Sequence, residues 1–136
     1  MKAILSNLKT ALDIKNDPRK KAKALIQKKD WKKAALVYGS IIKQELTKQD
    51  YYEYAKCCRF TKDLKTGFRI INEGLELFEV DKDLLVELSL LHMVNCDWEN
   101  AKKSWQKLNS LYDLSEINYL RYLRVLEELK KLERVQ

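Results

Sequence analysis

The feature that most constrains this chain is a pattern of small and large residues that returns at a nearly fixed spacing. The segment 30–38 recurs in modified form at 63–71 and at 97–105. In register, the positions are aspartates Asp30, Asp63 and Asp97, large residues Trp31, Leu64 and Trp98, small residues Ala34, Gly67 and Ala101, and bulky residues Tyr38, Ile71 and Trp105. Two helices approach closely only where a small side chain meets a large one. The period therefore predicts an all-α stack of antiparallel helix pairs.

The small positions of the preceding helices, Ala22, Ala55 and Ser89, keep the same steps of 33 and 34 residues. We expect one domain, 1–136, with about eight helices. An amphipathic helix over 2–14, within the segment 1–15, is expected to cap one end. The pairs are expected at 17–47, 49–80 and 82–113, with the second helix of the first pair running from 31 to about 46, and a final capping helix at 115–136. The aspartates of the register, and Asp17 before Pro18, are expected to be helix N-caps.

These residues carry a resemblance to a known family. The period, the helix-turn-helix unit and the pattern Trp31-x-x-Ala34-x-x-x-Tyr38 look like the tetratricopeptide repeat (TPR) over about residues 17–113. The proline usually found near the end of each second helix is absent here. The resemblance implies a right-handed superhelical α-solenoid whose first helices line a concave groove, and it implies that peptides are bound in that groove.

The motifs of common enzymes are absent from the sequence. It contains no glycine-rich phosphate loop, no Gly-x-Ser-x-Gly and no His-Glu-x-x-His. The one histidine, His92, is expected to be a core residue with a hydrogen-bond partner. We therefore predict a chain that is not an enzyme, with no cofactor and no metal site.

The three cysteines are Cys57, Cys58 and Cys96. They are expected to be buried thiols in a reducing compartment, with a redox role for the vicinal pair as the alternative. No run is apolar enough to cross a bilayer, so a cytoplasmic location is expected.

Positive charge is concentrated in the first part of the chain. The net charge is +7, and residues 1–50 carry 13 Lys and Arg against 5 Asp and Glu, whereas 51–136 carry 14 against 15. A basic end attracts phosphate, nucleic acid, anionic lipid or acidic peptide without selecting among them. The alternative is a lysine-rich face that only keeps the chain soluble.

Carrying the TPR groove pattern onto this sequence implies nine groove residues: Arg19, Lys23 and Gln27 from the first pair, Tyr52, Lys56 and Arg59 from the second, and Val86, Leu90 and Met93 from the third. The groove would be basic at one end and apolar at the other. It would suit an extended segment with an acidic residue or phosphate at one end and an apolar anchor at the other. The carboxylate clamp of some family members is not predicted, because acidic residues stand near its expected positions.

The last helix carries a wider apolar band than one packed face requires. One interpretation is a self-association seam, and hence a homodimer, through Tyr122, Val125, Leu129 and Leu132. The alternative is a helix that packs only on its own array.

The leading functional hypothesis is a non-enzymatic protein–protein interaction module or adaptor whose partner is a protein or peptide of acidic character. A second hypothesis is binding of an anionic polymer, RNA or a phosphate-containing glycan, through the lysine-rich N-terminal third. Nucleic acid is disfavoured because the aromatics of that third, Trp31 and Tyr38, fit the repeat core. A third is a noncatalytic TPR region of a larger bacterial polymer-synthesising transferase.

Overall fold

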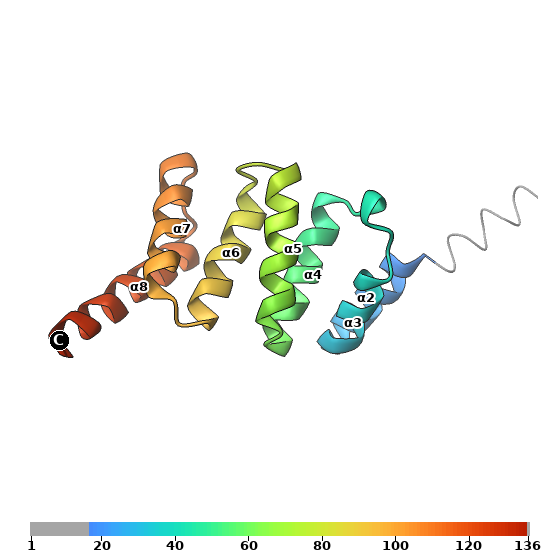
Figure 1. The fold of residues 1–136 in the computed structure, drawn as a ribbon, viewed down its shortest axis with the longest axis horizontal. Coiled ribbons are helices and arrows are strands. Elements are labelled where there is room, and N and C mark those ends of the chain that lie inside the picture. The colour runs from blue at the N-terminus through green and yellow to red at the C-terminus, as the bar shows by residue number, and fades with distance from the viewer. Residues whose placement is uncertain (1–16, 136) are drawn as a thin grey trace, which may run out of the picture.

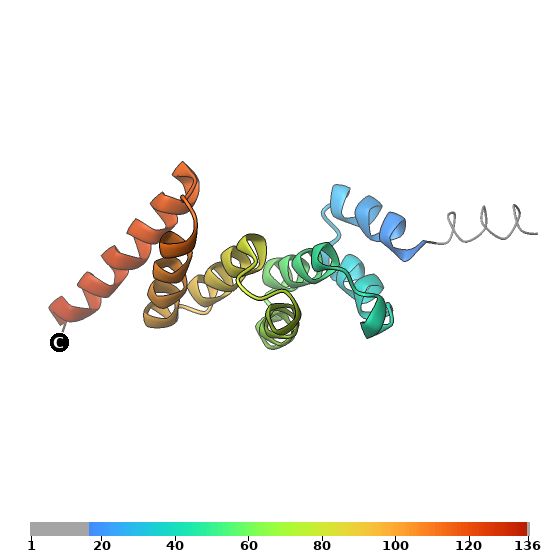
Figure 2. The same ribbon diagram turned by 90° about the horizontal axis from the view of Figure 1, so that it is seen from above.

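The computed structural model describes residues 17–135, which form helices joined by short turns, with no strand in that range (Figure 1). The first predicted helix, over 2–14, lies outside the described residues. The elements are α2 (Pro18–Gln27), α3 (Trp31–Gly39), the 3₁₀ turn η1 (Lys43–Glu45), α4 (Lys48–Thr61), α5 (Leu64–Leu77), α6 (Lys82–Val94), α7 (Trp98–Leu111) and α8 (Glu116–Val135). Seen from above, they make an open row rather than a closed bundle (Figure 2). The predicted all-α solenoid is confirmed.

The turn inside each helix pair has the same backbone structure. The residue before each capping aspartate is left-handed, with φ of 60° at Lys29, 61° at Lys62 and 55° at Cys96. The next N–H, that of the aspartate, bonds back to a carbonyl five residues earlier, at 2.8 to 2.9 Å. These are the features of a Schellman helix end. The residue before each register aspartate therefore forms the same turn in all three helix pairs.

The register aspartates begin the second helices as predicted. Their carboxylates accept hydrogen bonds from backbone N–H groups three residues on, in the pairs Asp30–Lys33, Asp63–Thr66 and Asp97–Asn100. Asp17 likewise accepts from the N–H of Arg19 at 3.0 Å. Each cap satisfies an N–H that has no partner inside its own helix. The predicted N-caps are confirmed.

The small residues of the register are buried where the helices cross. Gly67 shows the constraint most clearly, because a Cβ there would lie 3.1 Å from Leu91 Cδ2 and 3.3 Å from Cys58 Cβ. The side chains at the bulky positions, such as Ile71 and Trp105, are fully buried beside them. The contact of a small side chain with a large one therefore packs α4 against α5 in the same way as α6 against α7.

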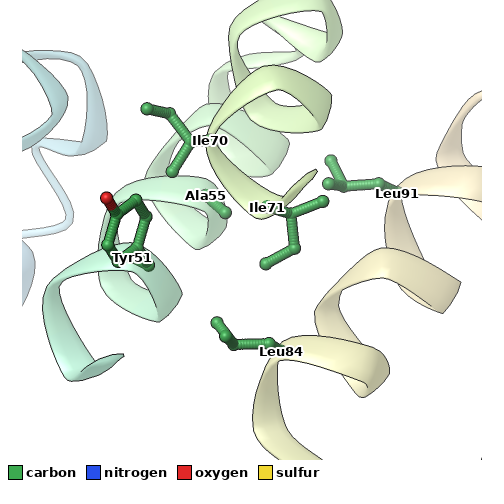
Figure 3. Close-up of a cluster of buried hydrophobic side chains, with 6 residues drawn as sticks. All are labelled: Tyr51, Ala55, Ile70, Ile71, Leu84 and Leu91. Atoms are coloured by element: carbon green, nitrogen blue, oxygen red, sulfur yellow. The ribbon is translucent and has the colours of Figure 1, made fainter. Parts of the chain in front are cut away.

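The central core joins two successive pairs. Figure 3 shows side chains of α4, α5 and α6 converging on one cluster: Tyr51, Ala55, Ile70, Ile71, Leu84 and Leu91. Residues from one pair thus bury those of the next, which is how a repeat array acquires a continuous core.

The second helix of the first pair is shorter than predicted. It ends at Gly39, not near Leu46, and the chain then passes through η1 before α4 begins. Glycine is a poor helix former, and the Ser40 hydroxyl donates to the Val37 carbonyl at 2.6 Å, which competes with helix continuation. A capping box starts α4, in which Thr47 and Asp50 each accept a hydrogen bond from the other's backbone N–H.

Candidate functional site

The first helices of the pairs, α2, α4 and α6, carry the nine residues expected in the groove. α8 occupies the next first-helix position, because its buried residues Asn118 and Val125 follow Leu84 and Leu91 of α6 by 34 residues, and all four are buried. α8 thus continues the face that the sequence analysis had extended only to α6.

The structure gathers most of these nine residues into two cavities. Arg19, Lys23 and Gln27 line a cavity of about 340 Å³ between α2 and α4. Arg59, Leu90 and Met93 line a second of about 320 Å³ between α4, α6 and α8. The three remaining residues line neither cavity: Tyr52, Lys56 and Val86. Lys56 Nζ lies 5.9 Å from the centre of the Tyr52 ring, a cation–π distance.

In the first cavity, the arginine is engaged within the chain. Arg19 donates through Nε and Nη2 to Asp50, with the shortest N–O distance 2.7 Å, and through Nη2 to the Glu45 carbonyl at 2.8 Å. Burial opposes ionisation of Asp50, but the hydrogen bonds from Arg19 and Thr47 outweigh it and lower the pKa of this carboxyl. Asp50 and Glu53 also line the cavity. Arg19 therefore ties α2 to α4, and this cavity carries mixed charge.

The second cavity is lined by arginines and apolar side chains without a carboxylate. Besides the three predicted residues, its lining includes Val94, Trp98, Arg121 and Arg124. Arg59 donates to Glu87, whose side chain is 1% exposed. Arg121 donates to Asn118 at 2.8 Å, and Arg124 lies 3.6 Å from Glu128. Each guanidinium thus has a polar partner on the protein, and that of Arg59 also lies 4.7 Å from the centre of the Phe60 ring.

Four residues of this cavity were not among the predicted groove residues: Val94, Trp98, Arg121 and Arg124. Arg124 follows Leu90 by 34 residues, so extending the groove register onto the last helix would have found it. The expected charge layout differs too. The cation Arg19 at the N-terminal end is paired with a buried carboxylate, while the end expected to be apolar carries three arginines over an apolar floor.

A third cavity, not anticipated from the sequence, lies on the opposite side of α4. It measures about 630 Å³ and is lined by residues of α3, α4 and α5, among them Leu36, Tyr54 and Arg69. Its lining also includes Gly39 and Ser40, where α3 ends.

Of the cysteines, two match the expectation and one does not. Cys57 and Cys58 are buried free thiols, and burial raises the pKa of each to about 12. A thiol with so high a pKa is hardly ionised at neutral pH, so the vicinal pair lacks the thiolate that redox chemistry uses. Cys96 is exposed rather than buried, because it occupies the left-handed turn before Asp97.

His92 packs in the core without the hydrogen-bond partner predicted for it. Its ring lies 5.0 Å from that of Phe68, and its buried Nδ1 has no partner among the described residues. Burial lowers the pKa of the imidazole, since a charged ring there would lose its water. The residue is a half-buried neutral ring in the interior of the array.

No family model and no curated protein sequence matches the chain. Among solved structures, the chain resembles the TPR domain of P58(IPK), with 15% sequence identity and a TM-score of 0.72 over 85% of this chain. The chain has the TPR fold. The match spans only 34% of that structure's chain. At this identity, the TPR likeness concerns the fold alone.

The final helix of the TPR array places the four predicted seam residues differently. Val125 is fully buried against α6 and α7, and Tyr122 and Leu129 are partly buried on the same cluster. Only Leu132, 51% exposed, is largely free. Val125 thus serves the chain's own core, which accounts for part of the apolar band.

Within residues 17–135, no group of three or more His, Cys, Asp or Glu is arranged to hold a metal ion. No helix in that range has the length and apolar character needed to span a bilayer.

Proposed function

We propose that this TPR array is a non-enzymatic protein-interaction module that binds an extended, partly acidic segment of a partner protein along the face formed by α2, α4, α6 and α8. The observation that carries the proposal is the pair of cavities on this face, one at each end, with Tyr52 and Lys56 between them. Because the two cavities are spread along several helices of one face, they suit an extended segment better than a compact ligand.

The residues between the cavities favour a peptide with carboxylates. The Tyr52 phenol, whose pKa is raised by burial, is protonated at neutral pH like an ordinary tyrosine and can donate a hydrogen bond. Lys56 supplies a cation directly over the same ring. A tyrosine with an adjacent cation offers apolar area and charge together, a combination enriched at protein interfaces.

The test is selection of peptides by display on the purified chain, followed by measurement of their Kd. The variant Lys23→Glu/Lys56→Glu changes two groove cations that make no ion pair within residues 17–135. It should weaken selected peptides at least tenfold, because each lost charged contact costs roughly 1.5–3 kcal/mol. The control Lys32→Glu/Lys65→Glu makes the same charge change on α3 and α5, where both lysines are exposed. Equal affinity for both variants would refute groove binding.

A second candidate function rests on the first hairpin. All seven lysines of residues 18–33 are exposed: Lys20, Lys21, Lys23, Lys28, Lys29, Lys32 and Lys33. Such a cluster would bind RNA or another anionic polymer. Trp31 is stacked on Phe60 at 4.4 Å between ring centres, which leaves it less available for stacking on a base. A steep fall of affinity with salt and little sequence preference would favour this candidate over the peptide module.

A further inference from the structure

The cavity between α4, α6 and α8 differs from the rest of the groove in combining cations with an apolar floor. Arg59, Arg121 and Arg124 lie around Leu90, Met93, Val94 and Trp98. Leu90 is 9% exposed, whereas Val94 is 40% exposed. The floor therefore has apolar surface that a ligand could cover, and covering it would remove water from the neighbouring guanidinium groups.

Two of the three arginines are held by buried partners. Glu87, which accepts from Arg59, is 1% exposed, and Asn118, which accepts from Arg121, is 9% exposed. A guanidinium has five N–H donors in a fixed plane, so one anchored edge orients the donors that remain. Less conformational entropy is then lost when a ligand binds.

The charge balance identifies which cations are available. Glu87 offsets Arg59, while Arg121 is held by a neutral amide. Arg124 has a carboxylate partner, Glu128, but this contact is 3.6 Å long and Arg124 is 65% exposed. An exposed ion pair of this kind contributes little and is readily exchanged. Arg121 and Arg124 are therefore the cations that a ligand can use.

We propose that this cavity is the specificity subsite of the groove, and that it takes an acidic side chain next to a large apolar one on the bound peptide. The carboxylate binds Arg121 and Arg124, and the apolar side chain lies on Met93, Val94 and Trp98. Planar guanidinium groups match a carboxylate with two parallel hydrogen bonds. The inference rests on the proposed peptide-binding function and adds the chemistry that the partner must present.

The experiment uses one defined probe, the amidated peptide acetyl-Leu-Glu-Phe-Glu-Leu, and the matched peptide with Gln in place of both Glu. Titration of the ¹⁵N-labelled full chain gives the Kd and locates binding through the indole N–H signal of Trp98. We expect the Glu peptide to bind at least tenfold more tightly than the Gln peptide and to shift that signal. Equal affinities for the two peptides would overturn the inference.

Variants of the chain test whether this cavity causes the difference in affinity between the Glu and Gln peptides. Arg124→Gln should bring the Glu peptide to within about twofold of the Gln peptide. The control Arg69→Gln removes an arginine of similar exposure, with the same four-residue ion pair to a glutamate, from α5. It should keep the full difference. Met93→Gln should weaken both peptides without changing their ratio. Discrimination that survives Arg124→Gln and Arg121→Gln together places the carboxylate elsewhere and overturns the inference.

Two further probes test whether the bound anion is a peptide carboxyl terminus or a nucleic-acid phosphate instead of a Glu side chain. An acetyl-Leu-Gln-Phe peptide with a free carboxyl terminus that binds more tightly than the Glu peptide would overturn side-chain recognition in favour of a chain end. Tighter binding of oligouridylate at the Trp98 signal would replace peptide with nucleic acid. If display-selected peptides respond to the Lys23 and Lys56 changes but not to those at Arg121 and Arg124, the proposed function stands and this inference fails.

Discussion

The left-handed turns give a stability prediction that can be worked from the backbone. Lys62 has φ of 61°, a conformation that costs a residue with a Cβ about 1–2 kcal/mol. Glycine avoids that cost, but its more flexible unfolded chain loses more conformational entropy on folding, which lowers the free energy of unfolding by about 0.5–1 kcal/mol. Lys62→Gly should therefore stabilise the chain by about 0.5–1 kcal/mol and raise Tm by roughly 2–5 °C. Urea denaturation followed by circular dichroism measures the free energy of unfolding.

A matched variant fixes the sign of that prediction. Lys103 is exposed in the interior of α7, so Lys103→Gly should destabilise the chain by about 1 kcal/mol. The turns at Lys29, Lys62 and Cys96 belong to different helix pairs, and glycine at all three should add to roughly 2 kcal/mol. If Lys62→Gly destabilises the chain as much as Lys103→Gly, the left-handed turn is not a source of strain and the reasoning fails.

Four other outcomes follow from the structure. Asp63→Ala should lose about 1 kcal/mol in urea denaturation through loss of the α5 cap, and Asp63→Asn should lose much less. Glu87→Ala should cost about 2–3 kcal/mol, because it leaves the Arg59 side chain, which is 17% exposed, without its carboxylate partner, and a smaller loss for Glu87→Gln would show that the accepted hydrogen bond matters. Burial lowers the pKa of His92, so as pH falls below about 6.5 the unfolded chain takes up the proton before the folded chain does, and the free energy of unfolding should decline. Thermal melts of His92→Gln should show a weaker decline over the same pH range. For the predicted homodimer, Leu132→Glu should reduce the sedimentation mass at high concentration if the exposed end of α8 pairs with a second copy, and a one-chain mass for the unmodified protein would contradict pairing.

The helix stack could be read from the sequence because its signal is local and repeated. The small residues Ala34, Gly67 and Ala101 indicate close helix crossings by their size alone. The aspartates Asp30, Asp63 and Asp97 each cap the helix that follows them. The end of α3 is also marked locally, by Gly39 and Ser40, but the apolar residues Ile41 and Ile42 that follow favoured the longer helix predicted to run to about residue 46. Ile42 proves to be 62% exposed, beyond the end of α3.

The ligand-facing charges could not be read in the same way, because their pairing depends on how helices pack. Arg19 and Asp50 are 31 residues apart, and Arg59 and Glu87 are 28 apart. Each pair joins one first helix to the next, so two of the cations expected to bind a ligand instead hold the array together. Nothing in the local sequence around Arg19 or Arg59 marks this use.

The same register explains why arginines without a buried carboxylate partner occur at the C-terminal end of the groove. Glu53, Glu87 and Arg121 fall at equivalent positions 34 residues apart on α4, α6 and α8. On α6 this position supplies the carboxylate that neutralises Arg59 of the preceding first helix. On α8 it supplies a cation instead, beside Leu90 and Met93, which have no charge to pair with it. At this position the carboxylate of α4 and α6 is replaced by a guanidinium on α8. The side chain that joins two helices at Glu87 therefore contributes positive charge to a cavity at Arg121. A partner segment that brings a carboxylate to this cavity would supply the opposite charge to Arg121, as Arg59 does to Glu87 one repeat earlier.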